Sequence, residues 1–327
     1  MAERADNGVI HAYGFDAEGR AEALPPMAIG EPPEIGFDWI HVRHRPTDLR
    51  SWLIDMSGVP SEELGVLAGG NDRPRCLVSE TDDTLIILRG VNLLRGAVPE
   101  HMLPLIFHVT AHRIITVEYE ALAAVRDVTA SLARNHLFRT TGELLTELAM
   151  RLIERMDVVI NELSDRADDL EEGVWTPDLP ARFGNQVAAL RRLALTLRRT
   201  LTPQREALNR LAIEDPAWLS HRDRMRLREA ADKVIRMTDE LDSVRERVAV
   251  VHDQLIDRRA EKLNRTMLVL AKVTTLFAPL SLVAGLFGMN VGGIPFFDAP
   301  SGFFVVLLLT AGIGASVVIL FRQAGWL

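Results

Sequence analysis

Apolar positions change their spacing along the chain, and each change predicts a different kind of structure. From residue 36 to about residue 125, short apolar runs alternate with turn residues, which is the pattern of buried strands. Helices are expected between the strands at 47–55 and 61–68, where Asp48 and Ser61 are candidate N-caps. This part is therefore predicted to be a mixed α/β domain on a mostly buried sheet. Its predicted strands are 37–42, 75–78, 84–89, 103–109 and 113–118.

Beyond residue 135, apolar residues recur every three or four positions, which predicts amphipathic helices. Helices are expected at 141–174 and 181–213, with prolines in the segment between them. A third helix begins near His221 and meets no Pro or Gly before Pro279. If this helix continues to Phe287, it is about 100 Å long, and about a third of it is apolar. Several such helices, bundled side by side, would form a stalk.

Two apolar runs near the C-terminus, residues 267–287 and 302–321, predict membrane-spanning helices. Each is about 20 residues long, and at about 1.5 Å of rise per residue each spans the roughly 30 Å core of a bilayer. The connector 288–301 has no Lys or Arg and a single acid, Asp298. The positive-inside rule therefore places both termini in the cytoplasm and the connector outside. The basic residues that flank the runs are Arg258, Arg259, Lys262, Arg265 and Arg322.

Composition narrows the classes of function. The net charge of −8 argues against nucleic acid as a partner, because phosphate binding needs a concentrated basic face. The single cysteine, Cys76, cannot form an intrachain disulfide, which fits a reducing cytosol. The N-terminal segment has no apolar core of a signal peptide and is rich in Pro, Gly and charge, so we expect it to be mobile. The expected organisation is a mobile segment at 1–33, a cytoplasmic α/β domain at 34–135, long cytoplasmic helices with the stalk at 136–265, spans at 266–287 and 302–321, an outer loop at 288–301 and a cytoplasmic tail at 322–327.

One face of the first span carries small and polar side chains. Small residues let helices approach closely in lipid, and hydroxyl groups bond to one another or line water. The face is therefore either an ordinary packing face in a dimer or the lining of a narrow pore built from several copies. Its members, stepping by three or four, are Asn264, Met267, Leu270 with Ala271, Thr274, Ala278, Ser281 and Gly285.

The triplet Gly288-Met289-Asn290 stands where the first span leaves the membrane. A ring of Asn290 amides presents carbonyl oxygens without fixed charge, which suits a divalent ion held through its own water. Gly288 allows a tight backbone turn beside such a ring. The alternative is structural, since Gly and Asn are also common residues at helix C-termini.

With the two C-terminal spans and the long preceding helix, this triplet resembles the CorA metal-ion transporter family. The resemblance covers the whole layout and implies a funnel-shaped homopentamer around one central pore. It implies Asn290 at the outer mouth, the small and polar face from Ser281 to Asn264 along the path inward, and Asp253 further along the stalk. The Gly-Gly-Ile-Pro after the triplet is similar to the ZntB branch, whose members are associated with zinc and proton coupling. Many magnesium-transporting members have an acidic loop there, which this chain lacks.

The other candidate residues, acids, a lysine and histidines, each have a plain structural role as the alternative to metal binding or transport. Acidic residues before the break between the long helices either attract divalent cations or form a solvated hairpin tip. Lys272, inside the first span, either snorkels to the interface or forms a basic ring at the inner mouth. With no second Cys and no His-Glu-x-x-His, a tetrahedral zinc site within one subunit is not expected. His252 is the histidine most open to a site shared between subunits. The acids are Asp165, Asp168, Asp169, Glu171 and Glu172, and the other histidines considered are His41, His44, His108 and His112.

The sequence thus predicts a multi-pass divalent cation transporter of the inner membrane, with zinc as cargo and protons as the coupling ion. It would have no permanently bound cofactor, and its partners would be copies of itself and the lipid bilayer. A CorA-type channel that cytoplasmic magnesium closes is the first alternative. A membrane-anchored sensor or scaffold is an alternative from another class. An enzyme is the weakest hypothesis, because the chain shows no catalytic triad, cofactor loop or phosphate-binding loop.

Overall fold

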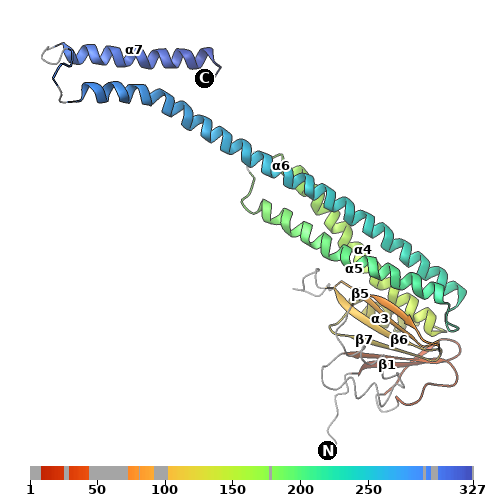
Figure 1. Ribbon diagram of the computed structural model, residues 1–327. Helices are drawn as coiled ribbons and strands as arrows, with labels where there is room; N and C mark the ends of the chain where they lie inside the picture. The colour runs from red at the N-terminus through yellow and green to blue at the C-terminus, as the bar shows by residue number, and fades with distance from the viewer. Residues whose placement is uncertain are drawn as a thin grey trace, which may run out of the picture. The chain divides into compact units, whose positions relative to one another are not determined.

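The computed structural model describes residues 9–25, 29–43, 73–80, 82–91, 102–176, 179–289, 292–295 and 301–325. The chain forms two compact units, Met1–His252 and Asp253–Leu327 (Figure 1). The first unit contains a β-sheet and most of the long helices, and the second contains the apolar helices. The helices predicted at 47–55 and 61–68 lie outside the described residues.

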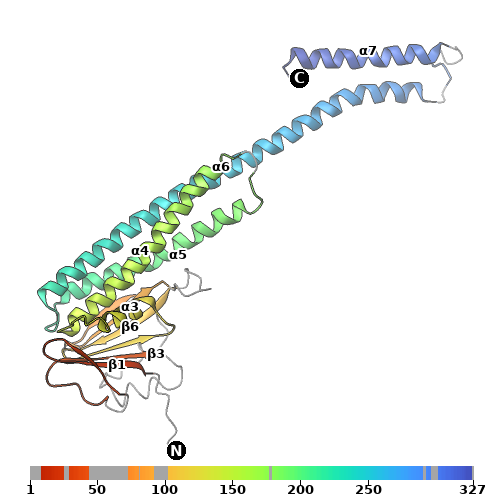
Figure 2. The same ribbon diagram turned by 180° about the vertical axis from the view of Figure 1, so that it is seen from behind.

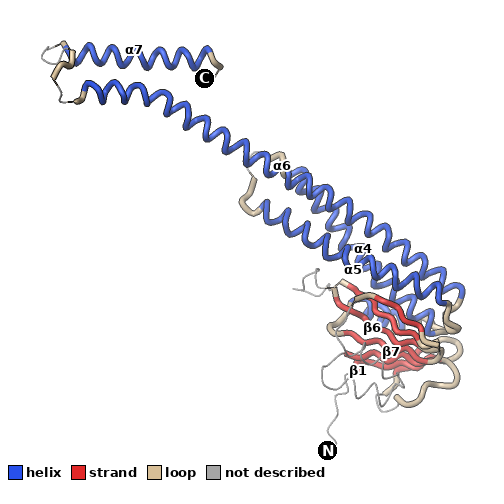
Figure 3. The backbone as a smooth tube through the Cα atoms, in the orientation of Figure 1, coloured by secondary structure: helices blue, strands red, loops and turns tan. Residues whose placement is uncertain are grey.

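The sheet of the first unit has seven strands in the order β2-β1-β3-β7-β6-β5-β4 (Figure 3). β3 and β7 run parallel, and the other neighbouring pairs are antiparallel. The five strands predicted from the sequence are confirmed as β3 to β7. The bounds are β1 Val9–Phe15, β2 Ala21–Ala23, β3 Phe37–Arg43, β4 Arg75–Val78, β5 Thr84–Gly90, β6 Leu103–Val109 and β7 Arg113–Glu118.

The expectation of a mobile segment at 1–33 is wrong for β1 and β2, which extend the sheet beyond β3. β1 pairs with β3 over its length, and the rings of Phe15 and Phe37 stack with centroids 4.3 Å apart. β1 was not predicted because only Ala12 and Phe15 supply buried apolar side chains in this strand. The other side chains on its inner face are polar or aromatic, so they do not show the usual alternation of a half-buried strand.

The two faces of the sheet differ in character, because successive side chains along each strand point to opposite faces. One face carries an apolar cluster that includes Ile40, Ile115 and Ile106 from neighbouring strands. On the other face, Ile86 and Phe107 lie opposite each other on β5 and β6, where α4 and α5 contact the sheet. Farther along that second face, toward β1, the side chains become polar.

Five described helices complete the fold: α3 Ala123–Leu132, α4 Thr141–Gly173, α5 Phe183–Glu214, α6 His221–Phe287 and α7 Gly302–Gln323. The last four confirm the sequence prediction, with ends within two residues of it. Their ends have local causes. Thr140 accepts a hydrogen bond from the Glu143 backbone N–H, and α5 stops where Asp215 takes a left-handed conformation at φ 52°. α3 was not predicted.

Helices α4, α5 and the first part of α6 run side by side in the first unit (Figure 2). Their apolar stripes face inward, and Leu148, Leu197 and Leu241 are examples of side chains that are almost fully buried. Ion pairs at the outer edges of this three-helix bundle join neighbouring helices. Arg226 on α6 pairs with Glu147 on α4 at 2.7 Å, and α5 is joined to α6 by Arg198 and Asp242 at the same distance.

Candidate cation pathway

The second unit contains two helices that are long and apolar enough to cross a membrane, the end of α6 and the whole of α7. None of the residues in their most apolar windows is buried within the chain. Large apolar side chains that are exposed all along a helix in an isolated chain need either lipid or other protein around them. Leu268 and Phe277 on α6 and Phe303 and Leu308 on α7 are typical, with exposed fractions between 48% and 73%.

The small and polar face of α6, which extends from Asn264 to Gly285, is exposed in the single chain. This face also points in a different direction from the side of α6 that contacts α7. On the opposite side of α6, the side chain of Leu280 lies against α7, because a Cβ added at Gly314 would be 3.6 Å from Leu280 Cδ2. At about 100° per residue, Leu280 points about 150° away from the mean direction of the small and polar face.

Helix α7 therefore contacts the side of α6 that is turned away from the small and polar face. Within the described part of the second unit, this leaves Thr274, Ala278 and Ser281 exposed. Their chemistry is suited to close helix packing or to contact with water. Gly285 supports the same view, since a Cβ added there would meet no described atom within 4 Å. The face is thus available to other copies of the chain or to an ion path.

The end of the first span is described up to Met289. The Gly288 N–H donates to the carbonyl oxygen of Ala284 at 2.9 Å, so the helical hydrogen bonding continues to this residue. A Cβ on Gly288 would stand 3.0 Å from the same oxygen, which is closer than ordinary contact. Met289 is 46% exposed. Asn290 lies outside the described residues, so its place at an outer mouth stays a prediction.

The connector contains a glycine whose backbone role the sequence reasoning missed. Gly293 has φ 101°, a conformation that side-chain-bearing residues rarely adopt. Gly288 has no such angle, so the left-handed turn of the described connector lies at Gly293. The dipeptide Gly292-Gly293 is the signal that could have located it, because paired glycines commonly mark turns.

The candidate residues of the long helix, His252 and Asp253, are both exposed on α6. Among the described residues, no three His, Cys, Asp or Glu side chains are grouped so that they could hold a metal ion. A role for these two residues in metal binding therefore stays a prediction that depends on other subunits. His108 lies buried in β6, and His112 lies in the following turn, where its Nδ1 is 2.9 Å from the Gly36 carbonyl oxygen.

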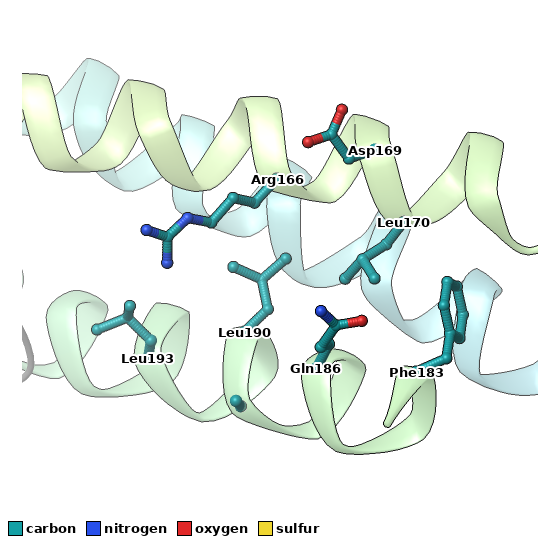
Figure 4. Close-up of a pocket in the computed structure, with 8 residues that line it drawn as sticks. Arg166, Asp169, Leu170, Phe183, Gln186, Leu190 and Leu193 are labelled. Carbon is teal, nitrogen blue, oxygen red and sulfur yellow. The ribbon is translucent and has the colours of Figure 1, made fainter. Parts of the chain in front are cut away.

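Of the acidic residues at the end of α4, Asp168 takes part in a contact with another helix. Asp168 forms an ion pair with Arg247 of α6, whose guanidinium also donates to the Ser164 hydroxyl at 2.7 Å. Asp169 stands with Arg166 at the rim of a cavity of about 470 Å³ between α4 and α5 (Figure 4). The cavity is mainly apolar inside, where Leu170, Phe183, Leu190 and Leu193 line it. The geometry therefore fits a solvated hairpin tip better than a cation site.

The structure defines a class of protein: a sheet-containing unit joined by one long helix to a unit of two membrane-spanning helices. Comparison with known proteins gives the family. The model of the family described as CorA-like Mg2+ transporter protein matches residues 34–323. The chain belongs to this family.

Individual relatives extend over nearly the whole chain. A divalent cation transporter of Pseudomonas aeruginosa, CmaX, is 35% identical over 325 residues, which cover 98% of both proteins. The zinc transport protein ZntB of Pectobacterium carotovorum is 30% identical over 328 residues, covering 99% of this chain and 98% of that protein. The solved structure of full-length CmaX matches with a TM-score of 0.84 and 32% identity, and it covers 99% of this chain and 100% of its own.

The protein is therefore a membrane-embedded divalent cation transporter of the CorA family and not an enzyme. Its two C-terminal helices are the membrane spans. The predicted family, the α/β domain, the long helix and the pair of apolar helices are confirmed.

Proposed function

We propose that this transporter carries zinc across the inner membrane, with proton coupling, through a central pore built by five copies of the chain. The observation that carries the proposal is the small and polar face of α6, which is turned away from α7. In the sequence, this face is followed by Gly288-Met289-Asn290. Asn264, Thr274 and Ser281 offer oxygen atoms along this face, and its other members are small or flexible. A hydrated divalent ion needs such a lining, because it gives up its water reluctantly.

The choice of zinc rests on the connector. Beyond Asn290 the chain continues as Val291-Gly292-Gly293-Ile294-Pro295, with Asp298 as the connector's single acid. A nearly uncharged loop gives little electrostatic attraction for hydrated magnesium, whereas the sequence Gly-Gly-Ile-Pro is similar to the ZntB branch. A relative with the name zinc transport protein ZntB is 30% identical to this chain.

The second candidate is a magnesium channel that closes when magnesium binds on the cytoplasmic side. It is favoured by the description of the matching family, which names magnesium. Both candidates use the same pore and the same Asn290 ring. They differ in cargo and in their dependence on a proton gradient, and flux measurements separate them.

The test is metal flux into liposomes that contain the purified full-length protein, with zinc and magnesium measured separately across an imposed pH gradient. We expect zinc flux that follows the proton gradient and falls to background in Asn290→Ala. A matched control is Asn185→Ala, which changes an exposed asparagine of α5 and should leave the flux unchanged.

Magnesium flux that is indifferent to pH would contradict the zinc proposal and favour the channel. Normal zinc flux in Asn290→Ala would contradict the role of the Asn290 ring. Absence of flux with both metals, from folded and oligomeric protein, would contradict transport by this route.

A further inference from the structure

A ladder of polar and aromatic side chains crosses the sheet of the first unit at β1, β3 and β7. His11 lies opposite His41, and His41 lies opposite Thr116, so the three side chains share one face. Tyr13 and Trp39 form the next rung on the same face. The rings of His11 and His41 stack with centroids 4.7 Å apart, and Trp39 meets His11 edge-on at 4.9 Å. Side chains of this kind in the middle of a buried sheet need hydrogen-bond partners.

Most of the ladder is connected by one chain of hydrogen bonds. The indole N–H of Trp39 donates to the Thr116 hydroxyl at 2.8 Å, and that oxygen lies 2.8 Å from His41 Nδ1. On the other side of the imidazole ring, His41 Nε2 faces Glu118 at 3.5 Å.

Glu118 closes the chain of hydrogen bonds. One carboxylate oxygen accepts from Arg43 at 2.8 Å, and the other accepts from the Leu122 backbone N–H at 3.0 Å. Burial alone would raise the pKa of Glu118, but the hydrogen bonds from His41 and Arg43 outweigh it and lower the pKa to about 2. The carboxylate is therefore charged and fully partnered at neutral pH.

His11 is the exception in this ladder. Its Nε2 is buried and has no hydrogen-bond partner among the described residues. Burial, with a smaller contribution from His41, lowers the pKa of the His11 imidazole to about 3, so the ring is neutral at physiological pH. A buried polar atom without a partner is costly, and in natural proteins such an atom often meets a ligand or water.

A slot of about 410 Å³ opens between this part of the sheet and helix α3. Its strand side presents the rings of His11 and Tyr13, and its helix side is mainly small and apolar, with Ala121, Val125 and Ala130. A space with aromatic rings on one side and small aliphatic side chains on the other suits a planar ring, and the volume is in the range of small-molecule sites.

The charges of the slot favour an anion. Two arginines, Arg43 and Arg126, and one carboxylate, Glu118, contribute to the lining, so its net charge is positive. Arg43 is engaged by Glu118. Arg126 is exposed on α3. Its guanidinium forms no ion pair or hydrogen bond with the described residues. A guanidinium without a partner is a strong donor to carboxylate or phosphate.

We propose that this slot is a binding site for a small planar aromatic anion. Its ring lies between His11 and Tyr13 on one side and α3 on the other, and it carries a group that hydrogen-bonds to His11 Nε2. Its anionic group meets Arg126 at the mouth. A metal ion is a poorer occupant, because the described residues hold no group of three suitable ligands. The site lies in the first unit, apart from the membrane spans, and it does not depend on which cation is transported.

The test is isothermal titration calorimetry on the purified full-length protein in detergent. Adenosine 5′-monophosphate is the first probe, with adenosine and inorganic phosphate as its two halves, and salicylate is the carboxylate probe. We expect saturable binding of at least one of the two anions, and each half of the nucleotide should bind at least tenfold more weakly than the whole. Binding of the nucleotide but not of salicylate assigns a phosphate group, and the reverse assigns a carboxylate.

Three variants locate the binding. Arg126→Gln should weaken it about tenfold, which corresponds to one charge-assisted hydrogen bond. His11→Phe keeps a ring and removes the nitrogen, so it should weaken binding by a similar factor. Ala130→Trp fills the slot from the exposed side of α3 and should abolish binding. The matched control is Arg134→Gln, an exposed arginine just beyond the end of the same helix and outside the slot, which should leave binding unchanged.

The proposal fails if neither anion binds at millimolar concentration, or if adenosine binds as tightly as its monophosphate and salicylate does not bind. It also fails if Arg134→Gln weakens binding as much as Arg126→Gln, or if Ala130→Trp binds normally. Circular dichroism of each variant, compared with the native protein, separates loss of the site from loss of the fold.

Discussion

Gln204 shows how one buried polar residue connects a helix to a sheet. Its side-chain Oε1 accepts from the Arg89 backbone N–H at 2.8 Å, and its Nε2 donates to the Arg89 carbonyl oxygen at 3.1 Å. On one side of β5 lies β4, and its pairing with β5 reaches only as far as Ile87. Arg89 therefore has no partner residue in β4, and the side-chain amide of Gln204 takes that place. It stands directly after Pro203, inside α5.

Replacing Gln204 by Leu should destabilise the protein by about 3 kcal/mol, since two partly buried backbone groups of Arg89 would lose their partner. The measurement is urea denaturation of the full-length protein in detergent, followed by tryptophan fluorescence. The control is Gln186→Leu, at an exposed position of the same helix, which should change the stability by less than about 0.5 kcal/mol. An equal effect of both variants would mean that the pairing with Arg89 contributes little.

The buried carboxylate of Glu118 predicts a pH dependence of stability. Its pKa is lowered from 4.5 to about 2 in the folded protein, so its contribution is present above pH 4.5 and is lost as the pH falls toward 2. Between neutral pH and pH 3 the loss should be about 2 kcal/mol. Glu118→Gln should be less stable than the native protein at pH 7, and its stability should fall less between pH 7 and pH 3.

Denaturant midpoints at a series of pH values measure this difference. Glu154→Gln, on an exposed part of α4, is the control and should follow the native curve. If the Glu118→Gln curve also runs parallel to the native curve, the carboxylate is not the group that titrates.

The sequence predicted which aliphatic residues are buried, because their hydrophobicity shows in the local pattern. It did not predict which buried polar side chains contact one another. Buried aliphatic runs such as Leu85–Leu88 are visible in the sequence. The buried ion pair of Arg113 with Asp38, at 2.6 Å, joins residues 75 positions apart, and so does the contact of His41 with Thr116. Nothing in the local sequence indicates such a partner. Buried pairs of this kind depend on the sheet register, which only the fold determines.

Among the elements, the helices whose ends have strong local signals were predicted well. α4 begins at the Thr140 cap, and α6 begins after Ser220, whose hydroxyl oxygen accepts from the Asp223 N–H at 3.2 Å. α3 was missed because its N-cap residue, Leu122, offers no side-chain cap. The cap comes instead from the Glu118 carboxylate at the end of β7. A cap supplied by an unusual residue pattern is not recognised by rules based on Ser, Thr, Asp and Asn.

The direction of the small and polar face of α6 can be tested by cysteine substitution. Ala278→Cys and Ser281→Cys should react with a charged methanethiosulfonate reagent, and the modification should block metal flux. Val269→Cys and Leu280→Cys, on the opposite side of the helix, should keep their flux. The native Cys76 should not interfere, because burial raises the pKa of its thiol to about 12.

Block at positions 269 and 280 with none at 278 and 281 would reverse the assignment of the two faces. Block at all four positions would mean that the reagent acts on assembly instead of on the ion path. Reaction of the native protein, measured by mass spectrometry, checks that Cys76 is inert.

On the scale of the whole molecule, one chain offers too little to enclose an ion path. Its two spans, α6 and α7, can line at most one side of a channel, and the small and polar face of α6 has no cover within the described part of its unit. The membrane spans followed directly from the sequence, since length and hydrophobicity suffice for that prediction. The number of copies did not, because no pattern in a single chain counts its neighbours. Five copies are implied by the resemblance to the CorA family.

Native mass spectrometry of the protein released from detergent micelles should give a mass five times that of the 36.4 kDa chain. Gly285→Leu adds bulk to the small and polar face, where a Cβ meets no described atom of the same chain, so it should reduce the share of pentamer through contacts between copies. Val273→Phe, which adds the same number of heavy atoms on the other side of α6, should assemble normally. A ring of copies closes only if each uses the same pair of surfaces, so a broad range of masses in the native protein would contradict a closed pore.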